Sequence, residues 1–125
     1  MVEIEDIRRF SDRIAQEFRP EKIILFGSYA YGKPDDDSDV DLLVILPFEG
    51  RSQDARRAIR RKASAPFAND LVVRTPQDVE RRYRQGDPLA REALDKGVVL
   101  YERHGSGMDR QGGDGLPRRR AGAGG

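Results

Sequence analysis

The sequence predicts one α/β or α+β domain built on a small mixed β-sheet flanked by helices. Short runs rich in Ile, Leu and Val, each the length of a buried strand, alternate with longer stretches whose apolar residues recur every three or four positions. The segments between these runs are long enough for the crossover connections that parallel neighbouring strands require. Together these two observations favour a sheet of mixed strand direction.

The first half of the chain opens with an amphipathic helix expected over residues 3–18. Its apolar residues, spaced by three and four, are Ile4, Ile7, Phe10, Ile14 and Phe18. Arg19-Pro20 ends this helix, because the residue before a proline disfavours helical dihedral angles. Three elements are expected to follow it: a strand over 22–26, a short helix over 28–32 and a strand over 39–46.

The basic segment 51–64 is predicted to form a helix with a thin apolar stripe. Ala55, Ile59 and Ala63 form the stripe. The rest of the surface carries a dense set of cations, namely Arg51, Arg56, Arg57, Arg60, Arg61 and Lys62. Such a run is most simply a solvated face, and we expect no direct binding of nucleic acid.

Two helix starts are marked clearly in the last third of the domain. Thr75-Pro76 and Asp87-Pro88 each place an N-cap residue before a proline at the first helical position. Gly97 is expected to end the second of these helices. Strands over 69–74 and 98–102 complete the predicted sheet.

The domain is expected to span residues 1–104. Beyond it, residues 105–125 are rich in Gly, Arg and Pro and contain almost no large apolar side chain, so we expect a disordered tail. At 125 residues the chain has room for one modest core.

The composition excludes several kinds of site. There is no cysteine, so thiolate metal sites and cysteine nucleophiles are excluded, and the single histidine, His104, lies beside the tail. The formal net charge of +1 gives no overall attraction to polyanions. No signal peptide or membrane-spanning run is recognisable, so we expect a cytoplasmic protein that does not bind membranes.

Residues 23–46 carry the most informative pattern. A Gly27-Ser28 turn follows one apolar run, and after ten intervening residues Asp39 and Asp41 open the next. Side chains alternate between faces along a strand, so both carboxylates are expected on the same side. A glycine lets backbone approach a charged ligand closely, and a helix start offers amides to phosphate.

Paired carboxylates beside a phosphate-binding turn point to phosphoryl chemistry with Mg²⁺, which prefers oxygen ligands and often shares them with substrate phosphates. Two such ions about 3.5–4 Å apart activate an attacking hydroxyl and neutralise the leaving group. Asp70 opens the 69–74 strand and is the candidate for a third carboxylate in the same site.

Calcium binding is the main rival explanation for this acidic stretch. An EF-hand loop needs glycine at its sixth position and glutamate at its twelfth. A loop starting at Asp35 has Val40 and Leu46 there, and one starting at Asp37 has Leu42 and Phe48, so we reject it. The aspartates at 35–37 are interpreted as a solvated loop, and Tyr29 and Tyr31 as packing or partner contacts.

The stretch GSYAYGKPDDDSDVDLLV resembles the signature of the nucleotidyltransferase superfamily related to DNA polymerase beta. The short length, the strand NDLVVR and the ending REALDKGVVLYER resemble its minimal branch, the antitoxin partners of HEPN-domain toxins, over about residues 1–103. The resemblance implies the polymerase beta-like fold. It also implies ATP-dependent transfer of AMP to a tyrosine hydroxyl of a cognate HEPN RNase toxin, which silences that toxin.

By this resemblance, Gly27 and Ser28 correspond to the phosphate-binding turn. Asp39, Asp41 and Asp70 correspond to the catalytic and Mg²⁺-binding carboxylates. The implied partners are ATP and a HEPN-domain toxin, in a hetero-oligomer. Two alternatives stay open: an antitoxin that acts by stoichiometric binding without catalysis, and an enzyme that modifies a small molecule such as an aminoglycoside.

Overall fold

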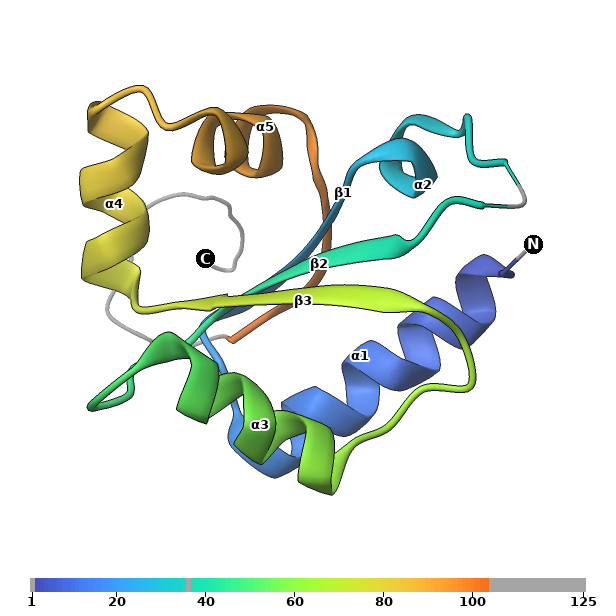
Figure 1. Ribbon diagram of the computed structural model, residues 1–125, viewed down its shortest axis with the longest axis horizontal. Helices are drawn as coiled ribbons and strands as arrows, with labels where there is room; N and C mark the ends of the chain where they lie inside the picture. The colour runs from blue at the N-terminus through green and yellow to red at the C-terminus, as the bar shows by residue number, and fades with distance from the viewer. Residues whose placement is uncertain (1, 36, 104–125) are drawn as a thin grey trace, which may run out of the picture.

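The computed structural model describes residues 2–35 and 37–103, which form a four-stranded mixed sheet with helices on both faces (Figure 1). The predicted fold class is therefore confirmed. The predicted tail, Asp36 and His104 lie outside the described residues. Within the described part of the chain, no helix combines the length and the apolar character needed to cross a bilayer.

Helices and strands follow the order that the sequence predicts. The elements are α1 (Ile4–Phe18), β1 (Lys22–Phe26), α2 (Ser28–Tyr31), β2 (Val40–Ile45), α3 (Ser52–Lys62), β3 (Asn69–Arg74), α4 (Pro76–Arg84), α5 (Pro88–Lys96) and β4 (Val98–Glu102). Both predicted N-caps are present, since the Thr75 side chain accepts a hydrogen bond from the Asp78 amide at 3.1 Å and Asp87 accepts one from the Ala90 amide at 2.9 Å.

The strands lie in the order β3-β2-β1-β4. β1 is antiparallel to both β2 and β4, whereas β2 and β3 are parallel and are joined through α3. A parallel pair needs such a crossover, because a tight turn cannot return the chain to the same end of the sheet. The crossover brings the starts of β2 and β3 together at one edge of the fold.

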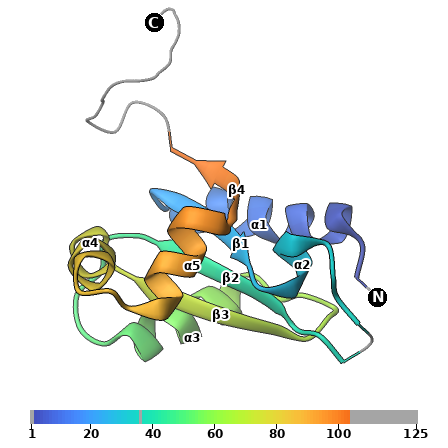
Figure 2. The ribbon, with the colours of Figure 1, turned by 90° about the horizontal axis from the view of Figure 1, so that it is seen from above.

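The core has one layer on each face of the sheet. α1 and α3 pack on one face through buried residues such as Phe10 and Ile59, which meet buried residues at alternate strand positions, such as Leu42. α4 and α5 cover the other face through Val79 and Ala93. Figure 2 shows α5 between α4 and α2 on this second side.

Candidate functional site

The predicted carboxylates lie where β2 and β3 begin. Asp41 is opposite Phe26 of β1 and also opposite Asp70 of β3, and Asp39 lies directly before β2. Because side chains alternate along a strand, Asp41 shares the face of Leu43, which packs toward α4 and α5. The parallel register of β2 and β3 thus brings together residues that are far apart in the sequence.

Position 27 must be glycine because it lies directly against the Asp41 carboxylate. Its φ of +78° lies in the region that favours glycine, and a Cβ added at this position would collide with the Asp41 carboxylate. The Gly27 carbonyl also accepts hydrogen bonds from the Ala30 and Tyr31 amides, at 3.0 and 3.2 Å, which starts the single turn of α2 at Ser28. Glycine therefore lets the turn and the carboxylate occupy neighbouring space.

The environment of Asp41 is unusual for a carboxylate. Burial, followed by the negative charges of Asp70, Asp39 and Glu92, raises its pKa from 3.8 to about 6. Asp39 and Asp70 are therefore close enough to Asp41 for their charges to act on it. Glu92 of α5 is a fourth member that the sequence did not predict, since it is one of several charged residues along an amphipathic helix.

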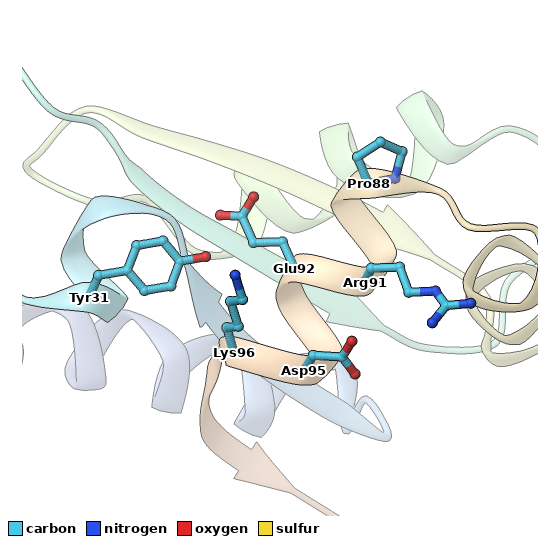
Figure 3. A pocket seen from close by; sticks show the side chains of 6 residues that line it. All are labelled: Tyr31, Pro88, Arg91, Glu92, Asp95 and Lys96. Carbon is cyan, nitrogen blue, oxygen red and sulfur yellow. The ribbon is translucent and has the colours of Figure 1, made fainter.

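Glu92 also contacts Tyr31 at the end of α2. Hydrogen bonding to the Glu92 carboxylate, together with burial and the charge of Glu92, raises the pKa of the Tyr31 hydroxyl to about 12. Figure 3 shows the Tyr31 hydroxyl directed toward α5. Glu92 thus links the carboxylate cluster to the space between α2 and α5.

The cluster fits a metal ion whose coordination is completed by water and by the phosphates of the substrate. Among residues 2–35 and 37–103, no three acidic or histidine side chains are arranged to hold a metal ion by themselves. Mg²⁺ commonly takes only one or two carboxylates and fills its other positions with water and substrate phosphates. Burial and then the neighbouring carboxylates raise the pKa of Asp41, and a divalent cation held by Asp39 and Asp41 would offset the negative charge of these carboxylates.

In the central loop, the Asp35 side chain stabilises a turn. The Asp35 carboxylate accepts hydrogen bonds from the Asp37 amide at 2.9 Å and from the Ser38 hydroxyl at 3.1 Å. This agrees with the interpretation of these aspartates as a solvated loop. Tyr29 packs against the core, and its hydroxyl accepts a hydrogen bond from the Val2 amide at 3.1 Å, as expected of a packing residue.

Arginines of β3 and α3 have structural partners. Arg74 donates to the Ser52 hydroxyl at 2.8 Å, and its Nε lies 3.7 Å from the Asp78 carboxylate, within ion-pair distance. On α3, Arg57 pairs with Asp54 and Arg60 donates to Asn69. α3 packs on the sheet face opposite Asp41, so its cations lie away from the carboxylate cluster.

Comparison with known proteins identifies a family for most of the chain. Residues 7–105 match the family described as the nucleotidyltransferase domain. No curated protein matches the sequence. A crystal structure of a Sulfolobus solfataricus protein that carries the provisional name nucleotidyltransferase is 20% identical, with a TM-score of 0.58, and covers 82% of each chain. Identity at this level shows a shared fold.

A second solved structure is a toxin-antitoxin with AMP-PNP. It is 17% identical and covers 78% of the present chain and 74% of its own, with a TM-score of 0.46. A TM-score this low does not establish a common fold.

Proposed function

Because the chain belongs to the nucleotidyltransferase domain family, we propose that it transfers AMP from ATP to a hydroxyl group at the carboxylate cluster. The observation that carries this proposal is the meeting of Asp41, Asp70 and the Gly27 turn at one end of the sheet. Family membership supports a transferase, and the cluster supplies the oxygen ligands that a magnesium-assisted transfer requires.

We propose a role for each residue of the cluster, in line with the resemblance to the nucleotidyltransferases. Asp39 and Asp41 would hold Mg²⁺, with Asp70 as a third ligand, and Gly27 and Ser28 would lie against the phosphates. Bound Mg²⁺ supplies charge neutralisation at the transferring and leaving phosphates. Among the described residues the Ser28 hydroxyl makes no hydrogen bond, so it can donate to a phosphate oxygen without losing a partner.

The proposed reaction is a substitution at the α-phosphorus. The acceptor oxygen forms a bond to this atom, while the bond between the phosphorus and the pyrophosphate oxygen breaks. Asp70 takes the acceptor proton, and pyrophosphate leaves with the electron pair. Asp70 is the best placed carboxylate for this role, since it lies on an edge strand and is exposed, whereas Asp41 is partly buried between two strands.

We propose that the acceptor is a tyrosine of a cognate HEPN-domain toxin, which AMP transfer neutralises within a hetero-oligomer. The resemblance of the central motif and of the last strands to the minimal antitoxin branch supports this assignment. The cluster also lies at the edge of a small sheet, and residues 2–35 and 37–103 contain no second domain that could enclose a small acceptor.

The test is transfer of label to the toxin. The protein is incubated with Mg²⁺, ATP labelled at the α-phosphate and the proposed HEPN-domain toxin, and the modified residue is located by mass spectrometry. We expect label on a toxin tyrosine, loss of labelling with Asp39→Asn, and full labelling with the control Asp37→Asn, which changes an exposed residue of the loop.

Three results would contradict the proposal. Equal labelling by wild type and Asp39→Asn would exclude the carboxylate cluster as the active site. An Asp39→Asn variant that fails to label but still neutralises the toxin in cells would favour stoichiometric binding. Transfer to a free aminoglycoside, with none to the toxin, would favour a small-molecule acceptor.

A further inference from the structure

A cavity of about 390 Å³ lies between α2 and α5 (Figure 3). Six residues line it: Tyr31, Pro88, Arg91, Glu92, Asp95 and Lys96. Glu92 places the cavity beside the cluster, because its charge also acts on Asp41. A substrate that extends from the carboxylates toward α5 would enter this space.

Most charged groups that line this cavity already interact with neighbouring residues. Arg91 donates from its Nε to the Tyr83 carbonyl at 2.8 Å, and its guanidinium carbon lies 4.2 Å from the centre of the Tyr83 ring. The Asp95 carboxylate accepts a hydrogen bond from the Tyr83 hydroxyl at 2.7 Å. Glu92 interacts with the Tyr31 hydroxyl.

Lys96 is the exception among these groups. Within the described residues its ammonium has no hydrogen bond and no ion pair. Figure 3 shows its side chain extending from the end of α5 toward the Tyr31 hydroxyl, whereas Arg91 and Asp95 point to the other side of the helix. Among the residues that line the cavity, Lys96 is therefore the cation on the side facing α2 that is available to bind a ligand.

The position of Lys96 is fixed by the end of α5. A Cβ at Gly97 would collide with the Ala93 carbonyl and with the Ile24 side chain, so glycine allows the helix to end directly against β1. The Gly97 amide donates to the Ala93 carbonyl at 3.0 Å, which closes the last turn. Lys96 thus projects from a helix end that is anchored to the same strand that leads into Gly27.

A nucleoside triphosphate needs a cation in addition to the metal, because its β- and γ-phosphates carry most of its negative charge. The turn and α2, residues 27–32 with the sequence GSYAYG, contain no Lys or Arg. A cation for the phosphates must therefore come from another element. An ammonium group on a flexible four-carbon stem is well suited to this role, since it can donate to several phosphate oxygens.

We propose that Lys96 binds the β- and γ-phosphates of the nucleotide in the cavity between α2 and α5. This inference rests on the proposed function. It assigns the direction of the substrate, with the α-phosphate at the carboxylates and the polyphosphate along α5. It also makes Lys96 a residue that selects triphosphates over monophosphates.

The test compares binding of ligands that differ only in phosphate number. Affinities for AMP and for an ATP analogue that is not cleaved between the α- and β-phosphates are measured by calorimetry with Mg²⁺. Lys96→Gln is expected to weaken binding of the ATP analogue about 10- to 100-fold and to change AMP binding by less than about twofold. Lys96→Arg is expected to keep most of the affinity for the ATP analogue.

The matched control is Lys62→Gln, because Lys62 is the exposed last residue of α3, on the opposite face of the sheet. This variant should bind both ligands as wild type does. If Lys96→Gln weakens both ligands equally, or neither, the inference is wrong while the proposed function stands. If wild type binds the ATP analogue no better than the Asp39→Asn variant does, the proposed function and this inference both fail.

Discussion

Replacing Asp41 by asparagine should stabilise the metal-free protein at neutral pH. The pKa of Asp41 is about 6 in the folded state, against 3.8 as the ordinary value, so the folded state binds this proton more tightly than the unfolded state. The free energy of unfolding therefore falls as the pH rises from below 4 to above 6. The Asp41→Asn substitution keeps the shape of the side chain but removes a charge that is disfavoured by burial and then by repulsion from Asp70, Asp39 and Glu92.

The expected gain follows from the size of the pKa shift. A shift of one pKa unit corresponds to about 1.4 kcal/mol, so a rise from 3.8 to about 6 sets an upper bound of about 3 kcal/mol at pH 7.5. Asp41 is partly exposed, and solvent screening reduces the expected gain to about 1 kcal/mol. For a domain of this size that gain corresponds to a rise in Tm of about 4 °C.

Urea unfolding followed by circular dichroism, after removal of metal with a chelator, measures this difference. The free energy of unfolding of Asp41→Asn should exceed that of wild type at pH 7.5. The difference should shrink as the pH falls and vanish once the Asp41 carboxyl of wild type is protonated in both the folded and the unfolded state. Asp12→Asn on the exposed side of α1 removes the same charge outside the cluster and should have little effect. An Asp41→Asn variant that is no more stable than wild type at pH 7.5, or whose advantage does not depend on pH, would refute the account of a repulsive cluster.

Two further substitutions probe the site. Gly27→Ala should cost about 1–3 kcal/mol of stability and abolish nucleotide binding, because the new methyl group collides with the Asp41 carboxylate. Gly86→Ala, which also has positive φ but open space around it, should cost only about 1 kcal/mol and leave binding intact, and equal effects of the two variants in urea unfolding and calorimetry would contradict this. Asp70→Asn should retain binding of the ATP analogue but slow transfer about 100-fold or more, because a general base is lost, and an unchanged transfer rate would remove Asp70 from that role.

The local signals of the sequence predicted most of the fold. The strands Lys22–Phe26, Asn69–Arg74 and Val98–Glu102 have the expected bounds, because each is a short apolar run between clear breakers. The N-caps at Thr75 and Asp87 are equally local. The ends of α3 were predicted less well. The sequence predicts a helix over 51–64, whereas the helix spans Ser52–Lys62. A thin apolar stripe indicates which face of a helix packs, but it does not mark where the helix begins and ends.

The site depends on contacts that no local pattern encodes. The pairing of Asp41 with Asp70 arises from the parallel register of β2 and β3, which is set by the packing of the crossover helix. Asp70 was nevertheless predicted as a candidate, because it opens the 69–74 strand, and the resemblance to the nucleotidyltransferases gave it the same role. Glu92 and Lys96 had no such signal, because charged residues are ordinary on an exposed helix face and only the docking of α5 brings them to the cluster.

The central claim is that Asp39, Asp41 and Asp70 bind a divalent cation beside the Gly27 turn. Paramagnetic Mn²⁺, which takes oxygen ligands as Mg²⁺ does, tests this directly by broadening the amide NMR signals of nearby residues. In the presence of the ATP analogue, we predict selective broadening at the starts of β2 and β3 and at the turn between β1 and α2, with signals of α3 unaffected. Broadening confined to the acidic loop around Asp35 and Asp37, or uniform weak broadening over the whole domain, would contradict the claim.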